Sequence, residues 1–404
     1  MGSYLLLKQA TIHNAITEEP FVADILSENG TIKKIAPVLE GKLVNEAKII
    51  DAMGIDVYPG FVEAHCHLGL DGFAVGFAGQ DFNEQNDPIT PQLSAVDAIY
   101  PQDETFRMAR EGGVTCACVG PGSSNVIGGT FCVIKTFGKR VDTMLVKEKA
   151  AMKIAFGENP KNCYKEKEIY SRMSVAAKLR ETLRKAQIYA KKCEQAGFPN
   201  GMNTIDSAEA EKINWKELPP YDAKLEAMLP VIRGEMPLKA HAHRADDIFT
   251  AIRIAREFGL DLTLEHTTDG ALIAEELAKE GFPVAVGPSF GHASKYELKN
   301  KDFKTPGILA KAGCTVSIIT DSPVVEQRYL ALCAGHAIHN GMGEFEALRA
   351  ITINAAAHIG VEDRVGSIEE GKDADFVLIK GSPFAIDTEI LYTIINGEIV
   401  YQKE

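Results

Sequence analysis

The chain has no apolar run long enough to cross a membrane, no excess of positive charge, no internal repeat and no low-complexity tract. Its 404 residues carry 43 Lys and Arg against 56 Asp and Glu, for a formal net charge of -13. An acidic protein repels phosphate backbones and anionic membrane surfaces, because like charges oppose association. We therefore expect neither a nucleic-acid partner nor a membrane partner.

We also expect no secretory segment, since the apolar run at residues 4–7 is too short for one. The eight cysteines are scattered along the chain, which favours reduced thiols and a cytoplasmic location. Hydrophobic content of 45% and charged content of 25% are ordinary for a globular protein. At this length we expect a large domain with a smaller accessory domain.

Both ends of the chain alternate short β-like runs with turn residues. The runs cover residues 4–7, 21–25, 31–35 and 43–51 at the start, and 375–379, 390–395 and 398–401 at the end. Asn396-Gly397 separates the last two runs and is a strong hairpin turn. The pattern predicts a small composite β-sandwich domain built from both termini, residues 1–58 plus 359–404.

The middle of the chain, residues 59–358, alternates apolar strands with helical patterns, which is typical of a parallel sheet in the α/β class. Its length predicts a (β/α)8 TIM-like barrel. Seven strands are visible, at residues 61–67, 114–119, 152–156, 238–241, 262–266, 284–287 and 315–320. We expect the eighth between Phe156 and Leu238. A charged helical run at 166–195 indicates a helical insertion around 162–230, packed outside the barrel or capping its mouth.

The first barrel strand ends in His65-Cys66-His67. Side chains alternate faces along a strand, so His65 and His67 point the same way. Two imidazoles on one face form half of a metal site. Catalytic groups of such barrels lie at the C-terminal ends of strands, so the other strand ends should supply the remaining ligands.

Three further strand ends carry matching side chains. His241 and His243 share a face after one strand, His266 ends the next, and Asp321 follows the last. Five of the ten histidines thus end predicted strands. Together with a strand-end carboxylate, this pattern indicates a metal-dependent catalytic site.

At this point the chain resembles the amidohydrolase superfamily of metal-dependent hydrolases, most closely its imidazolonepropionase-related branch, which includes cyclic-amide hydrolases and Xaa-Pro dipeptidases. The motifs are residues 59–67, which look like the family's first-strand entry, and residues 366–377, which look like its return to the small β domain. The resemblance implies the metal ligands His65, His67, His241, His266 and Asp321. By the same analogy His241 is preferred to His243, which would contact substrate or support a ligand.

A bridging ligand for a second ion is the open part of this set. Many members of the superfamily use a carboxylated lysine or a glutamate on the third or fourth strand. Glu158 lies at a predicted strand end, and we prefer it to Lys153, which we place lower on the strand and on the opposite face. A carboxylated Lys135 is the alternative.

The resemblance implies cleavage of a carbon–nitrogen bond in a small-molecule amide or cyclic amide. We expect one or two divalent ions per chain; Zn²⁺ suits these ligands best, and Fe²⁺ or Mn²⁺ fit nearly as well. The ion would acidify water to a pKa of about 7, with Asp321 as proton shuttle. His266 and His243 complete the catalytic group that we expect.

Candidates for binding substrate are His243, Arg172, Arg244 and His292. The two arginines are candidates to clamp a substrate carboxylate bidentately, and His292 follows the strand at residues 284–287, the seventh of the expected eight. The loops at residues 71–91 and 120–129 are expected near the mouth of the barrel.

Two alternatives use the same residues. The ligand set also supports an aminohydrolase (deaminase) or a dipeptidase, although deaminases of this kind often carry a glutamate near the position of His243. A catalytically silent scaffold is the rival from another class, and the presence of all five strand-end ligands argues against it. Homo-oligomers are common among such barrels, so a second copy of the chain is a candidate partner, although the sequence does not give the oligomeric state.

Overall fold

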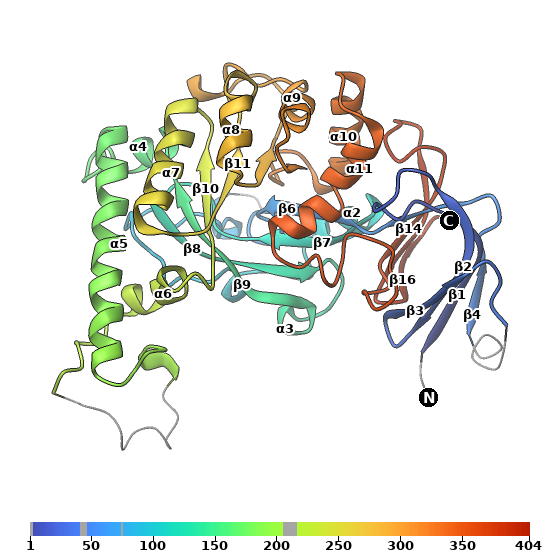
Figure 1. The fold of residues 1–404 in the computed structure, drawn as a ribbon, viewed down its shortest axis with the longest axis horizontal. Helices are drawn as coiled ribbons and strands as arrows, with labels where there is room; N and C mark the ends of the chain where they lie inside the picture. The colour runs from blue at the N-terminus through green and yellow to red at the C-terminus, as the bar shows by residue number, and fades with distance from the viewer. Residues whose placement is uncertain (1–2, 41–46, 74–75, 205–215) are drawn as a thin grey trace.

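The computed structural model of this protein describes residues 3–40, 47–73, 76–204 and 216–404. Its backbone forms two eight-stranded sheets, one at the centre of the molecule and one built from both ends of the chain (Figure 1). In the described part of the chain, no helix is both long and apolar enough to cross a membrane. All eight cysteines are free.

The terminal sheet pairs its strands in the order β16-β15-β14-β5-β1-β2-β3, with β4 beside β1. Phe376 of β14 lies opposite Pro59 of β5, so the two ends of the chain meet there. Residues 43–46, the start of the strand expected at 43–51, lie outside the described residues. The sandwich packing and the domain boundaries stay predictions. The strands are β1 (Tyr4–Ile12), β2 (Phe21–Glu28), β3 (Thr31–Ala36), β4 (Lys48–Asp51), β5 (Asp56–Pro59), β14 (Phe376–Lys380), β15 (Glu389–Ile395) and β16 (Glu398–Gln402).

The central sheet is the TIM-like barrel, with its strands neighbouring one another in chain order. It is nearly closed, because β13 contacts β6 and the His67 amide donates to the Ser322 carbonyl at 2.8 Å. Its strands are β6 (Phe61–Cys66), β7 (Val114–Val119), β8 (Ile127–Lys135), β9 (Leu145–Ala155), β10 (Leu238–Ala242), β11 (Leu262–His266), β12 (Val284–Val286) and β13 (Val316–Ile318).

The position predicted for the hidden strand was wrong. The missing strand is β8, which precedes Phe156, and it runs antiparallel to both β7 and β9. Gly128 and Gly129 had indicated a loop, whereas both are buried within the strand. The hairpin needs no crossover helix, so the strand–helix alternation that revealed the other strands is absent there.

Helices cover the barrel, and they are α2 (Glu104–Glu111), α3 (Val141–Met144), α4 (Glu158–Tyr164), α5 (Arg172–Gln195), α6 (Ala223–Ile232), α7 (Ala245–Phe258), α8 (Ala274–Glu280), α9 (Thr305–Ala312), α10 (Leu330–His339), α11 (Glu344–Ala350) and α12 (Ile353–His358). The long helix α5 begins at a capping box between Ser171 and Ser174. It packs against α6 and α7 on the outer side of the barrel (Figure 1). Of the two places expected for it, it occupies the one outside the barrel.

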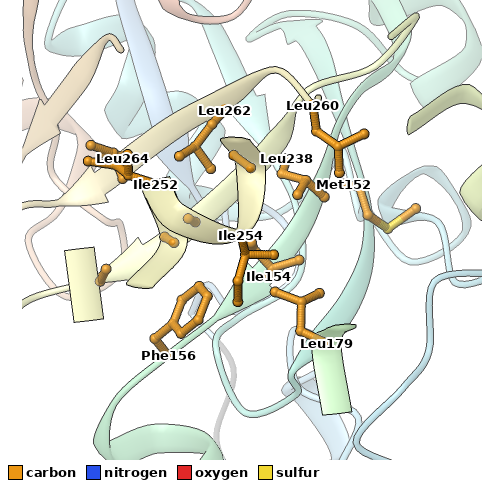
Figure 2. Close-up of a cluster of buried hydrophobic side chains, with 14 of the residues drawn as sticks. Met152, Ile154, Phe156, Leu179, Leu238, Ile252, Ile254, Leu260, Leu262 and Leu264 are labelled. Atoms are coloured by element: carbon orange, nitrogen blue, oxygen red, sulfur yellow. The ribbon is translucent and has the colours of Figure 1, made fainter. Parts of the chain in front are cut away.

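The core between the barrel and its helices shows which strand face points outward. Alternate residues of β9, β10 and β11, such as Ile154, Leu238 and Leu264, pack against Ile252 of α7 and Leu179 of α5 (Figure 2). The intervening residues of these strands therefore face the barrel interior. Those residues build the site.

Candidate metal centre

The first group of candidate ligands joins the first and last barrel strands. His65 and His67 come from the end of β6, and Asp321 follows β13. The Asp321 Oδ1 atom lies 3.6 Å from Nε2 of His65 and 3.3 Å from Nε2 of His67. Both imidazoles use Nδ1 elsewhere: His67 Nδ1 lies 2.7 Å from the Gly120 carbonyl oxygen, and His65 Nδ1 lies 3.1 Å from Glu265 Oε2. If Nδ1 of each ring carries the proton, the lone pair of each Nε2 atom is on the side of Asp321.

A second group stands beside the first. It consists of His241 on β10, His243 just after β10 and His266 at the end of β11. The ligand atoms of these three residues lie within 4.8 Å of one another. The His65 and His266 ring centroids are 5.1 Å apart, so the two groups adjoin. Nδ1 of His243 lies 2.8 Å from Thr268 Oγ1, and Nδ1 of His266 lies 2.8 Å from the Gly287 carbonyl oxygen.

His266 reaches the site through an unusual backbone conformation. By strand alternation it shares the parity of Leu262 and Leu264, which face outward. Its φ of 74° and the φ of 42° at Thr267 lie in the left-handed region and redirect the chain at this point. The imidazole thereby comes within 4.4 Å, centroid to centroid, of the His241 ring.

The buried nitrogen atoms of this second group fit a metal ion. Among the described residues, neither ring nitrogen of His241 nor Nε2 of His266 has a hydrogen-bond partner. An unpaired buried polar atom is costly, so such atoms mark a site for an ion. Burial lowers the pKa of His266 to about 4 and holds the pKa values of His65, His241 and His243 well below the usual range. The imidazoles are therefore neutral at pH 7, as metal binding requires.

Lys153 lies beside the first ligand group. It is fully buried on the interior face of β9, and its Nζ lies 3.2 Å from Nε2 of His65. The placement of Lys153 away from the site was wrong. The sequence argument placed Lys153 on the face opposite Glu158 by counting both residues along one strand. Strand β9 ends at Ala155, so Glu158 is not part of it. Burial lowers the pKa of Lys153 to about 8, with the nearby Lys239 acting in the same direction.

Glu158 and Lys135, the two bridging candidates from the sequence, are held elsewhere. Glu158 is the first residue of α4; its Oε1 accepts from the Glu297 amide, and its own amide donates to Glu297 Oε2, both at 2.8 Å. The Lys135 ammonium lies 2.6 Å from Asp375 and 2.9 Å from Asp373, at the junction with the terminal sheet. The structure brings neither side chain to the histidines, which corrects both predictions.

Three of the substrate candidates do not line the cavity next to the histidines. Arg172 Nε donates to Asp247 at 2.8 Å. Arg244 pairs with Asp246 through two nitrogen atoms, at 3.0 and 2.9 Å. His292 is exposed on the loop after β12. Only His243 of the four substrate candidates lines the cavity beside the metal ligands.

Buried carboxylates that sequence reasoning missed surround the ligands. Glu265 Oε1 lies 2.7 Å from His358 Nε2, and Oε2 lies 3.1 Å from both Lys239 Nζ and His65 Nδ1. Glu63 accepts from the Thr320 amide at 3.0 Å and the His65 amide at 3.1 Å, and so connects the chain at both ends of the first ligand group. Glu63 lies two residues before His65 and so shares its strand face, and Glu265 lies on the interior face of β11. Polar residues on an interior face need partners, so this alternation is a signal by which the sequence could have indicated them.

The cavity at this end of the barrel has a volume of about 390 Å³. His67, His241, His243 and Asp321 lie on its wall. The remaining lining residues are the polar Asp71, Asn83, Ser123, Ser124, Asn159, Asn162, Ser294 and Lys295 and the less polar Phe82, Cys163, Pro288, Leu298, Pro323 and Val324. The candidate ligands thus open onto a space suited to a small molecule.

Comparison with known proteins gives the class of this protein. The model of the Amidohydrolase family matches residues 233–400. A solved amidohydrolase from Thermotoga maritima MSB8 is 38% identical, with a TM-score of 0.91, over 99% of this chain and 100% of that one. The chain belongs to the amidohydrolase family, as its strand-end motifs indicated.

Curated relatives agree but are matched only in part. Amidohydrolase tasK of Hapsidospora irregularis is 27% identical over 93% of this chain and 40% of its own length. An imidazolonepropionase of Symbiobacterium thermophilum is 34% identical over 35% of this chain and 33% of its own. The chain therefore spans well under half of these relatives. A prolidase solved with N-methylphosphonate-L-proline, at 16% identity and a TM-score of 0.59, shares the fold.

Proposed function

We propose that this protein is a metal-dependent amidohydrolase that cleaves the carbon–nitrogen bond of an amide or cyclic amide in a small substrate. The observation that supports this most is the meeting of two three-residue ligand groups at one end of the barrel, beside one cavity. The imidazolonepropionase and prolidase among its relatives and structural neighbours act on bonds of this kind, by their names.

The ligand set that we propose differs from the sequence prediction at the bridge. His65, His67 and Asp321 would hold one ion, and His241 and His266 a second. Lys153, carboxylated on Nζ as in other members of the superfamily, would connect the two in place of Glu158. The lowered pKa of Lys153 supports this, because only the neutral amine reacts with CO₂ to form a carbamate. A divalent ion, with Zn²⁺ best suited, would supply Lewis acidity to the substrate carbonyl and to water.

Asp321 is the residue that we propose to move the proton. Burial alone would raise its pKa, but the imidazoles of His266, His67 and His65 hold it below its usual range, so the group is a carboxylate at neutral pH. It would accept a proton as water adds to the carbonyl carbon and pass that proton to the nitrogen as the carbon–nitrogen bond breaks. His243, on the cavity wall, would contact the substrate.

The test begins with the metal content of the purified full chain and of the chain reloaded with Zn²⁺. We expect two equivalents, with hydrolysis of at least one compound in a panel of N-acyl amino acids, dipeptides and cyclic amides. Release of an amine or ring opening supports amide cleavage, whereas release of ammonia from an amidine or aromatic amine would favour the aminohydrolase alternative. A reloaded chain that binds no metal would refute the proposal.

Asp321→Asn then tests the proton shuttle. We expect kcat to fall about a hundredfold to ten-thousandfold, while most of the metal stays bound. Asp261→Asn is the matched control, because Asp261 is exposed at the opposite end of the barrel, before β11. Unchanged turnover in Asp321→Asn would remove the shuttle from the mechanism.

A further inference from the structure

One lysine reaches the cavity beside the candidate ligands. Of the described residues that line this cavity, Lys295 is the only lysine or arginine. It belongs to the loop after β12, and its side chain is 21% exposed. Its Nζ lies 2.7 Å from Glu297 Oε1 and donates to Asn159 Oδ1 at 2.9 Å. The contact with Asn159 is a hydrogen bond, whereas the contact with Glu297 is an ion pair, since Glu297 Oε1 has no hydrogen-bond partner among the described residues. The ammonium therefore keeps an N–H group for a ligand.

The surroundings of Lys295 hold it in place. Glu297 is 1% exposed and is fixed from behind by the Glu158 amide at 2.8 Å and by Arg172 Nη2 at 3.7 Å. Asn159, at the start of α4, donates to Ser123 Oγ at 2.6 Å. Lys295, Asn159 and Ser123 are therefore connected by hydrogen bonds along one polar side of the cavity, with one residue from helix α4 and two from loops. A pre-organised wall binds a ligand without the cost of ordering a free side chain.

The positive charge of Lys295 acts on the histidines of the cavity wall. Next to burial, it is among the causes that lower the pKa values of His241 and His243. Glu297 Oε1 lies 3.9 Å from Nε2 of each of these histidines. The Lys295 ammonium therefore lies close enough to the candidate metal ligands for one small substrate to contact both.

We propose that Lys295, with Asn159 and Ser123, forms a subsite for the carboxylate of the substrate. The inference rests on the proposed function and narrows it, because the substrate becomes an amide that also carries a carboxylate, such as an N-acyl amino acid. Arg172 and Arg244, which the sequence indicated for this task, do not line the cavity, whereas Lys295 does. The apolar side chains of Phe82, Leu298 and Val324 in the same cavity suit an apolar body next to that carboxylate.

The experiment compares matched ligands that differ only in charge. N-acetyl derivatives of Ala, Val, Leu, Pro and Phe and their carboxamides are titrated calorimetrically into the Zn²⁺-loaded full chain. We expect at least one carboxylate to bind about tenfold or more tightly than its carboxamide, since a charge-assisted hydrogen bond is lost in the neutral ligand. Equal affinities throughout the panel, or no binding by any member, would overturn the proposal.

The variant Lys295→Met assigns the preference to this residue. We expect the ratio of the two affinities to fall to about one, and to stay at the wild-type value in Lys299→Met, because Lys299 is exposed and does not line the cavity. The ratio is taken within each variant, so a general loss of affinity cancels. An unchanged ratio in Lys295→Met would overturn the proposal.

Two further controls keep the result decisive. If Lys295→Met fails to fold because Glu297 has lost its partner, the same ratio is measured in Lys295→Met/Glu297→Gln against Glu297→Gln alone, with the same expectation. Every titration is made in the Asp321→Asn background, where turnover is expected to be lost while most of the metal stays bound, so binding can succeed or fail independently of catalysis. A carboxylate preference without hydrolysis of any amide would contradict the proposed function and leave the subsite standing, and hydrolysis without the preference would do the reverse.

Discussion

Two buried lysines on neighbouring strands of the barrel differ in their close partners and in the direction of their pKa shifts. Lys135 ends β8 and is 4% exposed, while Lys153 lies on β9 and is fully buried. Lys135 lies within 2.9 Å of two carboxylates, Asp373 and Asp375, which raise its pKa above the usual value although burial opposes them. Lys153 has His65 as its close neighbour, and burial lowers its pKa to about 8.

The difference teaches that the partners of a buried lysine decide its chemistry. A paired ammonium is locked in the charged form and stabilises the contact between barrel and terminal sheet. An amine with a lowered pKa is partly neutral at pH 7 to 8 and is available to react or to bind. From the sequence, Lys135 had looked the better candidate, and the geometry reverses that order.

The largest effect should come from Lys153→Met. We expect the metal content to fall by one equivalent and kcat/KM to fall about a thousandfold, because several kcal/mol of charge stabilisation depend on an intact site. Elemental analysis and steady-state kinetics on the reloaded protein measure both. Glu158→Gln is the control: it should keep wild-type metal content. A loss of metal in Glu158→Gln but not in Lys153→Met would restore the sequence prediction and remove the contrast between the lysines.

Lys135→Met should act on stability and not on the metal. It leaves Asp373 and Asp375 beside a buried methyl group, and breaking a buried ion pair from one side costs about 3–5 kcal/mol. Urea unfolding of the wild type and the variant, each with the same metal content, measures the change. Wild-type stability combined with a lower metal content would show that Lys135 acts at the site after all.

Glu265→Gln tests whether the carboxylate that contacts His65 Nδ1 and Lys239 supports the ligands. We expect the affinity for Zn²⁺ to fall about tenfold to a hundredfold, because a carboxylate behind a histidine orients the ring and raises its basicity. Competition with a chelator gives the affinity. Glu226→Gln is a matched control, since Glu226 is also buried but accepts from Tyr189 and the Met202 amide, outside the barrel interior. Equal losses in both variants would mean that only folding is affected.

The smallest effect is a difference in pH dependence in the metal-stripped protein. The unfolded chain keeps a lysine proton up to a pKa of about 10.4. Folded Lys153 releases its proton near pH 8, so between these values the unfolded state binds more protons and stability should rise with pH. Lys135 has a raised pKa, so its stabilising pair is complete below about pH 10.4 and is lost only as the pH rises through the higher folded value.

Urea unfolding between pH 7.5 and 9.5 separates the two lysines. We expect the stability difference between wild type and Lys153→Met to change across this range, and the difference for Lys135→Met to stay constant. A flat difference for Lys153→Met would mean that the amine is charged throughout.

Local patterns determined much of this protein. The alternation of a strand was sufficient to place His65 with His67 and His241 with His243 on shared faces, because neighbours in a strand need no information from the rest of the fold. The Asn396-Gly397 turn forms the expected hairpin between β15 and β16 for the same reason. The order of the histidines and the aspartate at successive strand ends was sufficient to predict the barrel and the family.

Tertiary structure decided what alternation alone does not determine. The reversed strand β8 depends on pairing with β7 and β9. His266 reaches the site against its parity, because its backbone turns into the left-handed region. Lys153 and Lys135 have similar sequence surroundings, yet one meets an imidazole from β6 and the other two aspartates near the C-terminal sheet. Their partners lie 88 and about 240 residues away, and a pKa depends on distances in space, which only the folded chain defines.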